Sequence, residues 1–471
     1  MLFNSLEYLL FLPTAWALFW TFPARHRTTV LLVASYVFYA SWSVPYAAMV
    51  FALVVVNYLF GLALGRTARD RRLVLAAFIA FDLAVLGVFK YFDFASLSLA
   101  VGAHTLFGLA LDPPLLHLIL PLGISFFTFE FIHYLVDIYR GEVPVHSFSK
   151  FHVFAAFFPT QIAGPIKRFQ QFVPSLALLD RFDPVLAREG MLLIGRGLAK
   201  KSLLADRLSP WANRGFAAAA DGSISTPDAW LVTLAFSLQI FFDFSGYTDI
   251  ARGSAALFGF RIPINFDGPY LATSLADFWH RWHISLSTWL RDYVYIPLGG
   301  SRRTRIAVMR NLIVTMLLGG LWHGAAWHFV GWGALWGCGL ALHHLLRPYF
   351  ARRTRLPVVI AGWAFTQVFV LVAWVLFRAD SFATAGVMLR AMAGDGTHIS
   401  LLASKDMLAI AAVAVGLVAL TLLARTGRSL RLRLPEGRWR PALYGAASAA
   451  VILVALVAAP TGREAFIYFQ F

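Results

Sequence analysis

The sequence predicts an all-α, polytopic membrane protein with about eleven transmembrane helices and further re-entrant or interfacial helices. Composition supports this class, because 59% of the 471 residues are hydrophobic and only 14% are charged. Soluble domains carry about 25% charged residues. The mean hydropathy of +0.69 agrees, and long apolar runs recur throughout the chain. The length would suit about three soluble domains, but with this composition we expect one helical bundle.

The predicted spans follow from the apolar runs. In chain order they are residues 6–23, 29–43, 46–65, 73–91, 115–138, 228–248, 311–325, 328–346, 356–377, 407–424 and 441–459. Most approach the length of about 20 residues that a helix needs to cross a bilayer. No basic segment precedes the first run, which favours a retained span over a cleaved signal peptide.

The net charge of +16 lies mainly in short arginine-rich loops beside these spans. The most basic loops are residues 66–72, 302–305, 352–355 and 425–440. This arrangement is typical of cytoplasmic loops and argues against a nucleic-acid-binding surface. It predicts an N-terminus outside the cytoplasm, an acidic outward loop at about 93–113, and an outward loop at 378–404.

Two regions carry too much polarity for ordinary spans. Residues 141–227 mix polar side chains with short apolar runs, which favours re-entrant or interfacial segments. Residues 274–300 combine tryptophans with arginines, as expected of an interfacial helix or one that lines a water-filled funnel. His343 and His344, near the cytoplasmic end of a span, are interpreted as interfacial too.

His323 is the main candidate functional residue, because a titratable imidazole is costly inside a bilayer. It lies in an apolar segment, 311–345, between two basic loops. As a helix this segment would be about 52 Å long, which is too short to cross the bilayer core twice in full. We therefore expect a short hairpin with its turn near 324–326. The glycines at 319, 320 and 324 would let other backbone approach. The alternative is a packing histidine bonded to a carbonyl oxygen.

Other histidines raise the question of a metal site. His280 and His283 share a helix face at i,i+3 spacing, and His323 and His328 could add two nitrogens. No HExxH pattern or carboxylate trio accompanies them, so we predict no metal. The only cysteine, Cys338, excludes an intrachain disulfide and a thiolate cluster.

Acidic side chains also fall in or beside the apolar segments. These are Asp82, Asp137, Asp243 and Asp249. Asp243 and Asp249 end a predicted span in a polar run, where they either line a cavity or pair with Arg252 or Arg281.

Several long motifs then occur in a characteristic order. They are Phe89-Lys90-Tyr91 and the stretches 121–129, 134–140, 158–166, 243–249, 278–300 and 310–327. With these motifs the sequence resembles the membrane-bound O-acyltransferases nearly end to end. Within that family it is most similar to the membrane subunits of bacterial alginate O-acetyltransferases. The membrane proteins of D-alanyl-lipoteichoic acid transfer are more distant.

The resemblance implies a ring of spans around a thinned centre, where a tunnel joins a cytoplasmic acyl donor to an acceptor on the other side. His323 matches the catalytic histidine of the family, and His283 matches its second polar position. Further candidates for the tunnel lining are Trp322, Asn311, Arg291, Asp292, Gln239, Asp243 and Tyr247. The run from Phe129 to His133, with Glu130, departs from the family pattern.

We therefore expect a single membrane domain over 1–471, with N-terminal spans at 1–140, a catalytic core at 141–346 and C-terminal spans at 347–471. The resemblance implies a bacterial inner-membrane enzyme that uses acetyl-CoA as a substrate and holds no bound cofactor. It would O-acetylate an exopolysaccharide such as alginate or cellulose, with a periplasmic acetyltransferase or acetylesterase-like partner and the exopolysaccharide machinery.

The expected chemistry needs a base for the hydroxyl proton and a donor for the oxyanion. His323 would be the base, since an imidazole titrates near neutral pH, and His283 would orient the donor or stabilise the oxyanion. No serine or cysteine lies in a nucleophile-elbow pattern, which favours direct transfer; an acyl-histidine intermediate stays open. The alternatives are D-alanyl or other acyl transfer to teichoic acid, lipid or protein, and a transporter or flippase of a polymer precursor.

Overall fold

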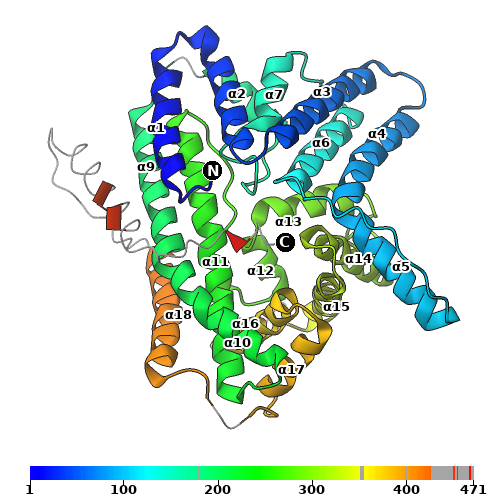
Figure 1. Cartoon of the computed structure of the whole chain (residues 1–471), viewed down its shortest axis with the longest axis vertical. Helices are drawn as coiled ribbons and strands as arrows, with labels where there is room; N and C mark the ends of the chain where they lie inside the picture. Colours follow the sequence, from blue (N-terminus) through cyan, green and yellow to red (C-terminus); the bar gives the residue numbers. More distant parts are fainter. Residues whose placement is uncertain are drawn as a thin grey trace. The chain divides into compact units, whose positions relative to one another are not determined.

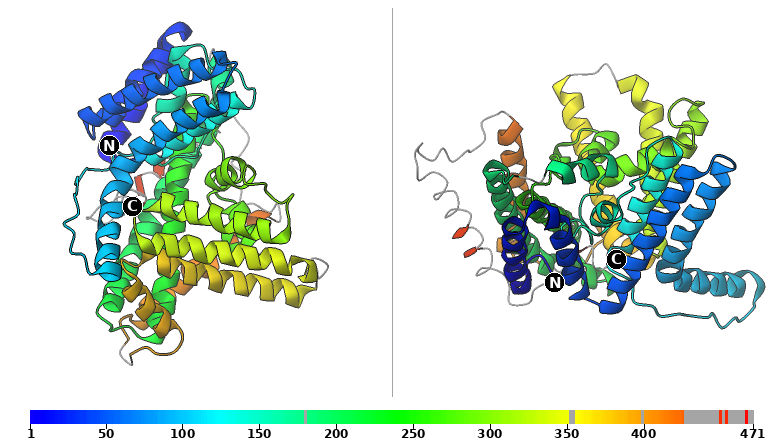
Figure 2. Two further views of the ribbon diagram at one scale, coloured as in Figure 1. Left: turned by 90° about the vertical axis from the view of Figure 1, so that its right-hand side faces the viewer. Right: turned by 90° about the horizontal axis from the view of Figure 1, so that it is seen from above.

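The computed structural model describes residues 1–178, 181–350, 355–397, 400–425, 449–450, 453–454 and 466–467. Every regular element within these residues is a helix (Figures 1 and 2), so the predicted all-α class is confirmed. Seven helical segments are long and apolar enough to cross a membrane. They are α3 (Val44–Arg66), the run Arg71–Phe107, α11 (Thr226–Leu257), α14 (Arg305–His323), α15 (Trp327–Phe350), α16 (Leu356–Arg378) and α18 (Ser404–Arg425).

The predicted number of eleven spans is not confirmed. Three of the predicted segments form helices of only 16 or 17 residues, namely α1 (Leu6–Thr21), α2 (Ala24–Ala40) and α6 (Ile124–Tyr139). The predicted span 441–459 lies almost wholly outside the described residues.

The predicted outward loop at 93–113 is wrong over most of its length. α4 (Arg71–Leu86), the π-helical turn η1 (Gly87–Tyr91) and α5 (Phe92–Phe107) form one continuous helix of 37 residues. The run remains apolar and contains no proline, and its first residue with a left-handed backbone is Gly108, where φ is +68°. The next helix, α6, begins at Ile124 rather than at 115, because prolines remove backbone donors from the intervening segment.

The described chain groups into two compact units. The first comprises residues 1–194 and 250–263. It contains α1 to α8, with α7 (Phe148–Ala156) and α8 (Phe169–Ser175) as short helices of the polar region. It contains a buried ion pair: the Lys167 ammonium lies 2.7 and 2.9 Å from the two oxygens of Glu130.

The second unit comprises residues 195–249 and 264–471. The polar region enters it as a continuous helical run, made of α9 (Pro184–Ala199), the π-helix η3 (Lys200–Ala205) and α10 (Asp206–Ala220). The short segments that were predicted throughout 141–227 are therefore found only in the first part of that region, before residue 184. Residues 274–300 form three pieces instead of one helix: α12 (Leu275–Arg281), α13 (Ile284–Leu290) and η5 (Arg291–Tyr295).

The predicted hairpin is present in this unit. α14 ends at His323 and α15 begins at Trp327, so the turn falls at 324–326 as expected. The arms are longer than predicted, since the 19 residues of α14 reach about 28 Å. The two helices lie side by side (Figure 2). Their close approach is possible because Gly320 lacks a β-carbon, which would overlap with the carbonyl oxygen of Phe329. α16 and α17 (Phe382–Met392) complete the packing around a tryptophan-rich core.

Candidate active site

His323 occupies the last position of α14, where the chain leaves the helix at an extended Gly324. Gly324 carries no side chain, and the ring of Phe329 packs in the space that a β-carbon would need. The imidazole of His323 is 6% exposed. Its ring centroid lies 5.1 Å from those of Trp332 and Phe377, which come from α15 and α16. Three helices therefore hold this histidine.

His283 lies at the break between α12 and α13. Its backbone adopts the left-handed conformation, with φ 43° and ψ 53°, which is unfavourable for a non-glycine residue. Asn265 holds the chain just beyond it: the Asn265 carbonyl accepts from Ile284 N at 3.0 Å, and Asn265 Oδ1 accepts from Ser285 N at 3.1 Å. Strain of this kind is concentrated at functional sites.

The indole of Trp322 contacts both histidines. Its ring centroid lies 5.0 Å from that of His323 and 6.1 Å from that of His283. Phe244 of α11 covers another side of His283 at 4.7 Å. His283 is fully buried and lies outside the seven spans. Burial lowers the pKa of His283 to about 3, so its imidazole is neutral at pH 7.

A cavity of about 550 Å³ is lined by residues of the same helices, although neither His283 nor His323 is part of its wall. Its wall includes Ile284 and Ser287, which follow His283 on α13, and Met316, two turns before His323 on α14. The remaining wall contains one carboxylate, Asp277, and several apolar side chains, together with a set of basic and hydroxyl groups. These are His280, Arg291, His343, His344 and Arg347, together with Ser274, Thr288, Tyr295, Ser301 and Thr315. Such a lining suits a polar, anionic ligand.

The other predicted tunnel residues have different environments. Arg291 lines the cavity and bonds to its neighbour Asp292 at 2.7 Å. Asn311 is fully buried and donates to the carbonyl oxygens of Leu298 and Gly300, at 3.2 and 3.3 Å. Asn311 therefore fixes the turn after η5. Gln239 is 8% exposed, and its Oε1 accepts no hydrogen bond from the described residues.

Asp243 and Asp249 form ion pairs, one of the two alternatives that the sequence left open, although with other partners. Asp243 lies 2.6 Å from the ammonium of Lys201 and accepts from Ile467 N at 2.8 Å. Asp249 lies 2.7 Å from both Arg196 and Lys200. Tyr247, one turn from Asp243, packs against Phe466 at 5.0 Å. Arg281 pairs with Asp277 instead.

The remaining histidines are spread around the site. His280 lines the cavity, and His328 Nδ1 lies 3.2 Å from the carbonyl oxygen of Leu376. Across the described ranges, no group of three or more histidine, cysteine or carboxylate side chains could hold a metal. His343 and His344, interpreted from sequence as interfacial, line the cavity.

Sequence reasoning missed four residues that shape the site: Phe244, Asn265, Trp332 and Phe377. Phe244 lies within a motif that had been singled out for its acids. Asn265 precedes His283 by 18 residues, Trp332 follows His323 by nine and Phe377 follows it by 54. An aromatic or amide side chain at such a separation gives no local sign of its partner.

Comparison with known proteins gives an independent line of evidence. The sequence profile described as the membrane-bound O-acyltransferase family matches residues 139–383. The chain is 44% identical over 407 residues to the probable alginate O-acetylase AlgI of Azotobacter vinelandii, covering 84% of this chain and 79% of that protein. It is 37% identical over 402 residues to the peptidoglycan O-acetyltransferase of Helicobacter pylori, covering 77% and 73%. It is 30% identical over 239 residues to the teichoic acid D-alanyltransferase of Streptococcus thermophilus, covering 47% and 56%.

Proposed function

Since this chain belongs to the membrane-bound O-acyltransferase family, we propose that it O-acetylates a bacterial exopolysaccharide, with His323 as the general base. The supporting observation is that His323 and His283 both contact Trp322, while α13 and α14, the helices next to them, also line a cavity with several basic side chains. The named relatives that act on alginate and on peptidoglycan both acetylate sugar polymers, which favours a carbohydrate hydroxyl as the acceptor.

In the proposed reaction His323 accepts the proton of the acceptor hydroxyl as its oxygen attacks the thioester carbonyl carbon. The carbon–sulfur bond then breaks, and the proton passes from His323 to the departing thiolate. His283 is neutral at pH 7, so one ring nitrogen can donate a hydrogen bond to the developing oxyanion. Direct transfer of this kind needs no serine or cysteine nucleophile.

The proposed donor is acetyl-CoA, which would enter the cavity between α12, α13, α14 and α15 from the cytoplasm. Its phosphates match the guanidinium and imidazole groups of Arg347, His343 and His344. The protein would then lie in the bacterial inner membrane, with its N-terminus on the periplasmic side. A periplasmic acetyltransferase or acetylesterase-like protein would carry the acetyl group to the polymer.

Reconstitution in liposomes with radiolabelled acetyl-CoA tests this proposal. Oligosaccharides of alginate, cellulose and peptidoglycan are offered as acceptors, alone or with a periplasmic fraction. We expect label in one acceptor with native protein and with His104→Ala, an exposed histidine on α5, and none with His323→Ala. Transfer by His323→Ala at the native rate would exclude His323 as the base.

The choice of donor is tested separately. Arg347→Gln should raise the KM for acetyl-CoA but leave the KM for acetyl-pantetheine, which lacks the nucleotide phosphates, unchanged. Label from a D-alanyl carrier in place of acetyl-CoA would favour the chemistry named for the teichoic acid relatives. Polymer-precursor uptake that survives His323→Ala and requires Asp243 would favour a transporter.

A further inference from the structure

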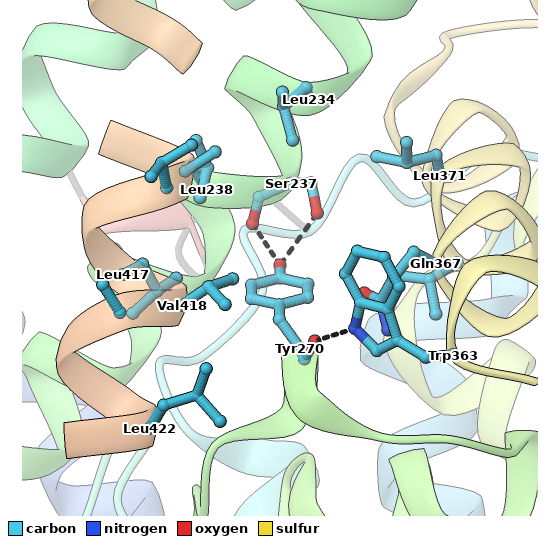
Figure 3. Close-up of a pocket in the computed structure, with 14 residues that line it drawn as sticks. Leu234, Ser237, Leu238, Tyr270, Trp363, Gln367, Leu371, Leu417, Val418 and Leu422 are labelled. Atoms are coloured by element: carbon cyan, nitrogen blue, oxygen red, sulfur yellow. Dashed lines mark hydrogen bonds between the residues drawn. The ribbon is translucent and has the colours of Figure 1, made fainter. Parts of the chain in front are cut away.

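A second cavity, of about 460 Å³, has neither His283 nor His323 in its wall; Figure 3 shows the residues that line it. Its walls come from α11, α16 and α18 and from the turn η4 (Pro269–Leu271). Leu238 stands on one side, Leu371 on another and Val418 on a third. The cavity therefore forms a groove between three long apolar helices.

The polar groups of this groove are all bonded to the protein. Tyr270 Oη donates to the backbone carbonyl of Ser237 and accepts from Ser237 Oγ at 2.8 Å (Figure 3). Trp363 Nε1 donates to the Tyr270 carbonyl at 2.9 Å, and Gln367 Nε2 donates to the Ala272 carbonyl at 3.3 Å. The space between them is bounded by aliphatic and aromatic carbon. A hydrocarbon chain suits it, because a polar ligand would lose its hydrogen bonds to water without replacement.

The helices that form the groove are themselves in an apolar environment. α11, α16 and α18 are all long and apolar enough to span a membrane. Only 6% of the most apolar stretch of α18 is buried within the protein, and Val415 of the groove is 69% exposed. The open side of the groove therefore faces the acyl chains of the bilayer.

One end of the groove is basic. Leu422 and Trp363 lie toward this end, Leu234 and Leu371 toward the other (Figure 3). α18 ends three residues beyond Leu422 at Arg425, and Arg355 precedes α16. Arg425 keeps 39% of its side chain exposed while it bonds to Asp267 at 3.4 Å.

In the sequence, residues 425–440 contain six arginines and one glutamate, and residues 352–355 contain three arginines. Basic clusters of this size directly beside a membrane span bind anionic lipid headgroups. Of these arginines, Arg355 and Arg425 lie within the described residues, at this end of two helices of the groove, and both are complementary to a negatively charged phosphate group.

We propose that the groove binds one acyl chain of an anionic glycerophospholipid, with the phosphate of the headgroup between Arg355 and Arg425 at the ends of α16 and α18. Two aromatic contacts connect the elements of this groove to the histidine pair. The ring of Tyr270 lies 6.3 Å from Trp282, the residue before His283, and Phe377 of α16 contacts His323. A bound lipid would support this wall of the site, whichever acyl acceptor the enzyme uses.

Native mass spectrometry of the full-length protein tests the proposal. Phosphatidylglycerol or phosphatidylcholine with identical acyl chains is added to the detergent-purified protein. We expect the native protein to retain phosphatidylglycerol preferentially. Val418→Trp, which fills the groove, should lose this retention, whereas Leu408→Trp, at an exposed position of α18 outside the groove, should keep it. Arg355→Gln and Arg425→Gln should each weaken the preference by about fivefold.

Several outcomes would overturn the proposal. One is native-like retention of phosphatidylglycerol by folded Val418→Trp; another is equal retention of both lipids by the native chain. A Val418→Trp protein that keeps its lipid but loses thermal stability would indicate that apolar residues of this chain fill the groove. A Val418→Trp protein that dissociates from a dimer would indicate that a second copy of this chain occupies the groove. If Val418→Trp does not fold, Ala414→Leu, a smaller change on the same wall, gives the same comparison.

Discussion

The indole of Trp322 and the imidazole of His283 meet at a centroid distance of 6.1 Å with their ring planes at 70°. The two residues come from α14 and from the break between α12 and α13. Since Trp322 also contacts His323, one aromatic ring forms a common wall for the two candidate catalytic imidazoles.

Trp322→Ala should reduce acyl transfer more than a change of the same size elsewhere in the core, because both imidazoles lose a neighbour. Truncation of a buried tryptophan costs about 3–5 kcal/mol, so Trp336→Ala, in the core away from the histidines, is the matched control. We expect both variants to lower the Tm, and Trp322→Ala alone to lower the turnover per folded molecule. Equal turnover in the two variants would argue against the shared wall.

Asn265→Ala should slow the reaction by releasing the chain after His283. It removes the acceptor of Ser285 N, and a buried donor without its partner costs about 1–3 kcal/mol. Turnover should fall while the KM for the donor changes little. Asn213→Ala, which removes an amide bonded to Arg378, should leave turnover unchanged.

The stability of the protein should depend on pH through His283. The folded pKa is about 3 and the ordinary value is 6.5, so the unfolded chain takes up the proton first. The stabilising contribution is complete above about pH 6.5 and is lost as the pH falls toward about 3. The slope is at most about 1.4 kcal/mol per pH unit. As the pH falls below about 6.5, the Tm should decrease less steeply in His283→Gln than in the native protein. Identical slopes of Tm against pH would assign the acid destabilisation to other groups.

Gly320→Ala should destabilise the α14–α15 hairpin, since the added β-carbon would overlap with the Phe329 carbonyl. Overpacking of this kind costs about 1–3 kcal/mol. Gly416→Ala on α18 is the control, because nothing lies within 4 Å of its β-carbon position. Thermal unfolding in detergent should show a lower Tm for the first variant only.

Asp243→Asn should affect stability more than chemistry. Lys201 lies 2.6 Å from Asp243 and 2.8 Å from Asp206, and all three are buried. Breaking a buried ion pair costs about 3–5 kcal/mol. The Tm should fall while turnover per folded molecule stays near native. Abolished turnover at a native Tm would instead place Asp243 in the reaction.

Much of this protein could be predicted from its sequence. Apolar runs and arginine-rich loops predict a helical membrane protein, because a bilayer admits few other backbone arrangements. The basic loops that flank 311–345 and the short length of that segment predict the turn at 324–326, where the structure has it. His283 and His323 stand out as polar residues in motif-rich surroundings. These properties depend on residues close together in the chain.

The tertiary structure alone decided which distant residues meet. Only packing brings Phe244, Trp332 and Phe377 against the histidines, and gives Asp243 and Asp249 their lysine and arginine partners. An apolar run records its preference for the bilayer but not the neighbour it packs against. The left-handed turn at His283 depends in the same way on contacts, such as those of Asn265, that no local pattern contains.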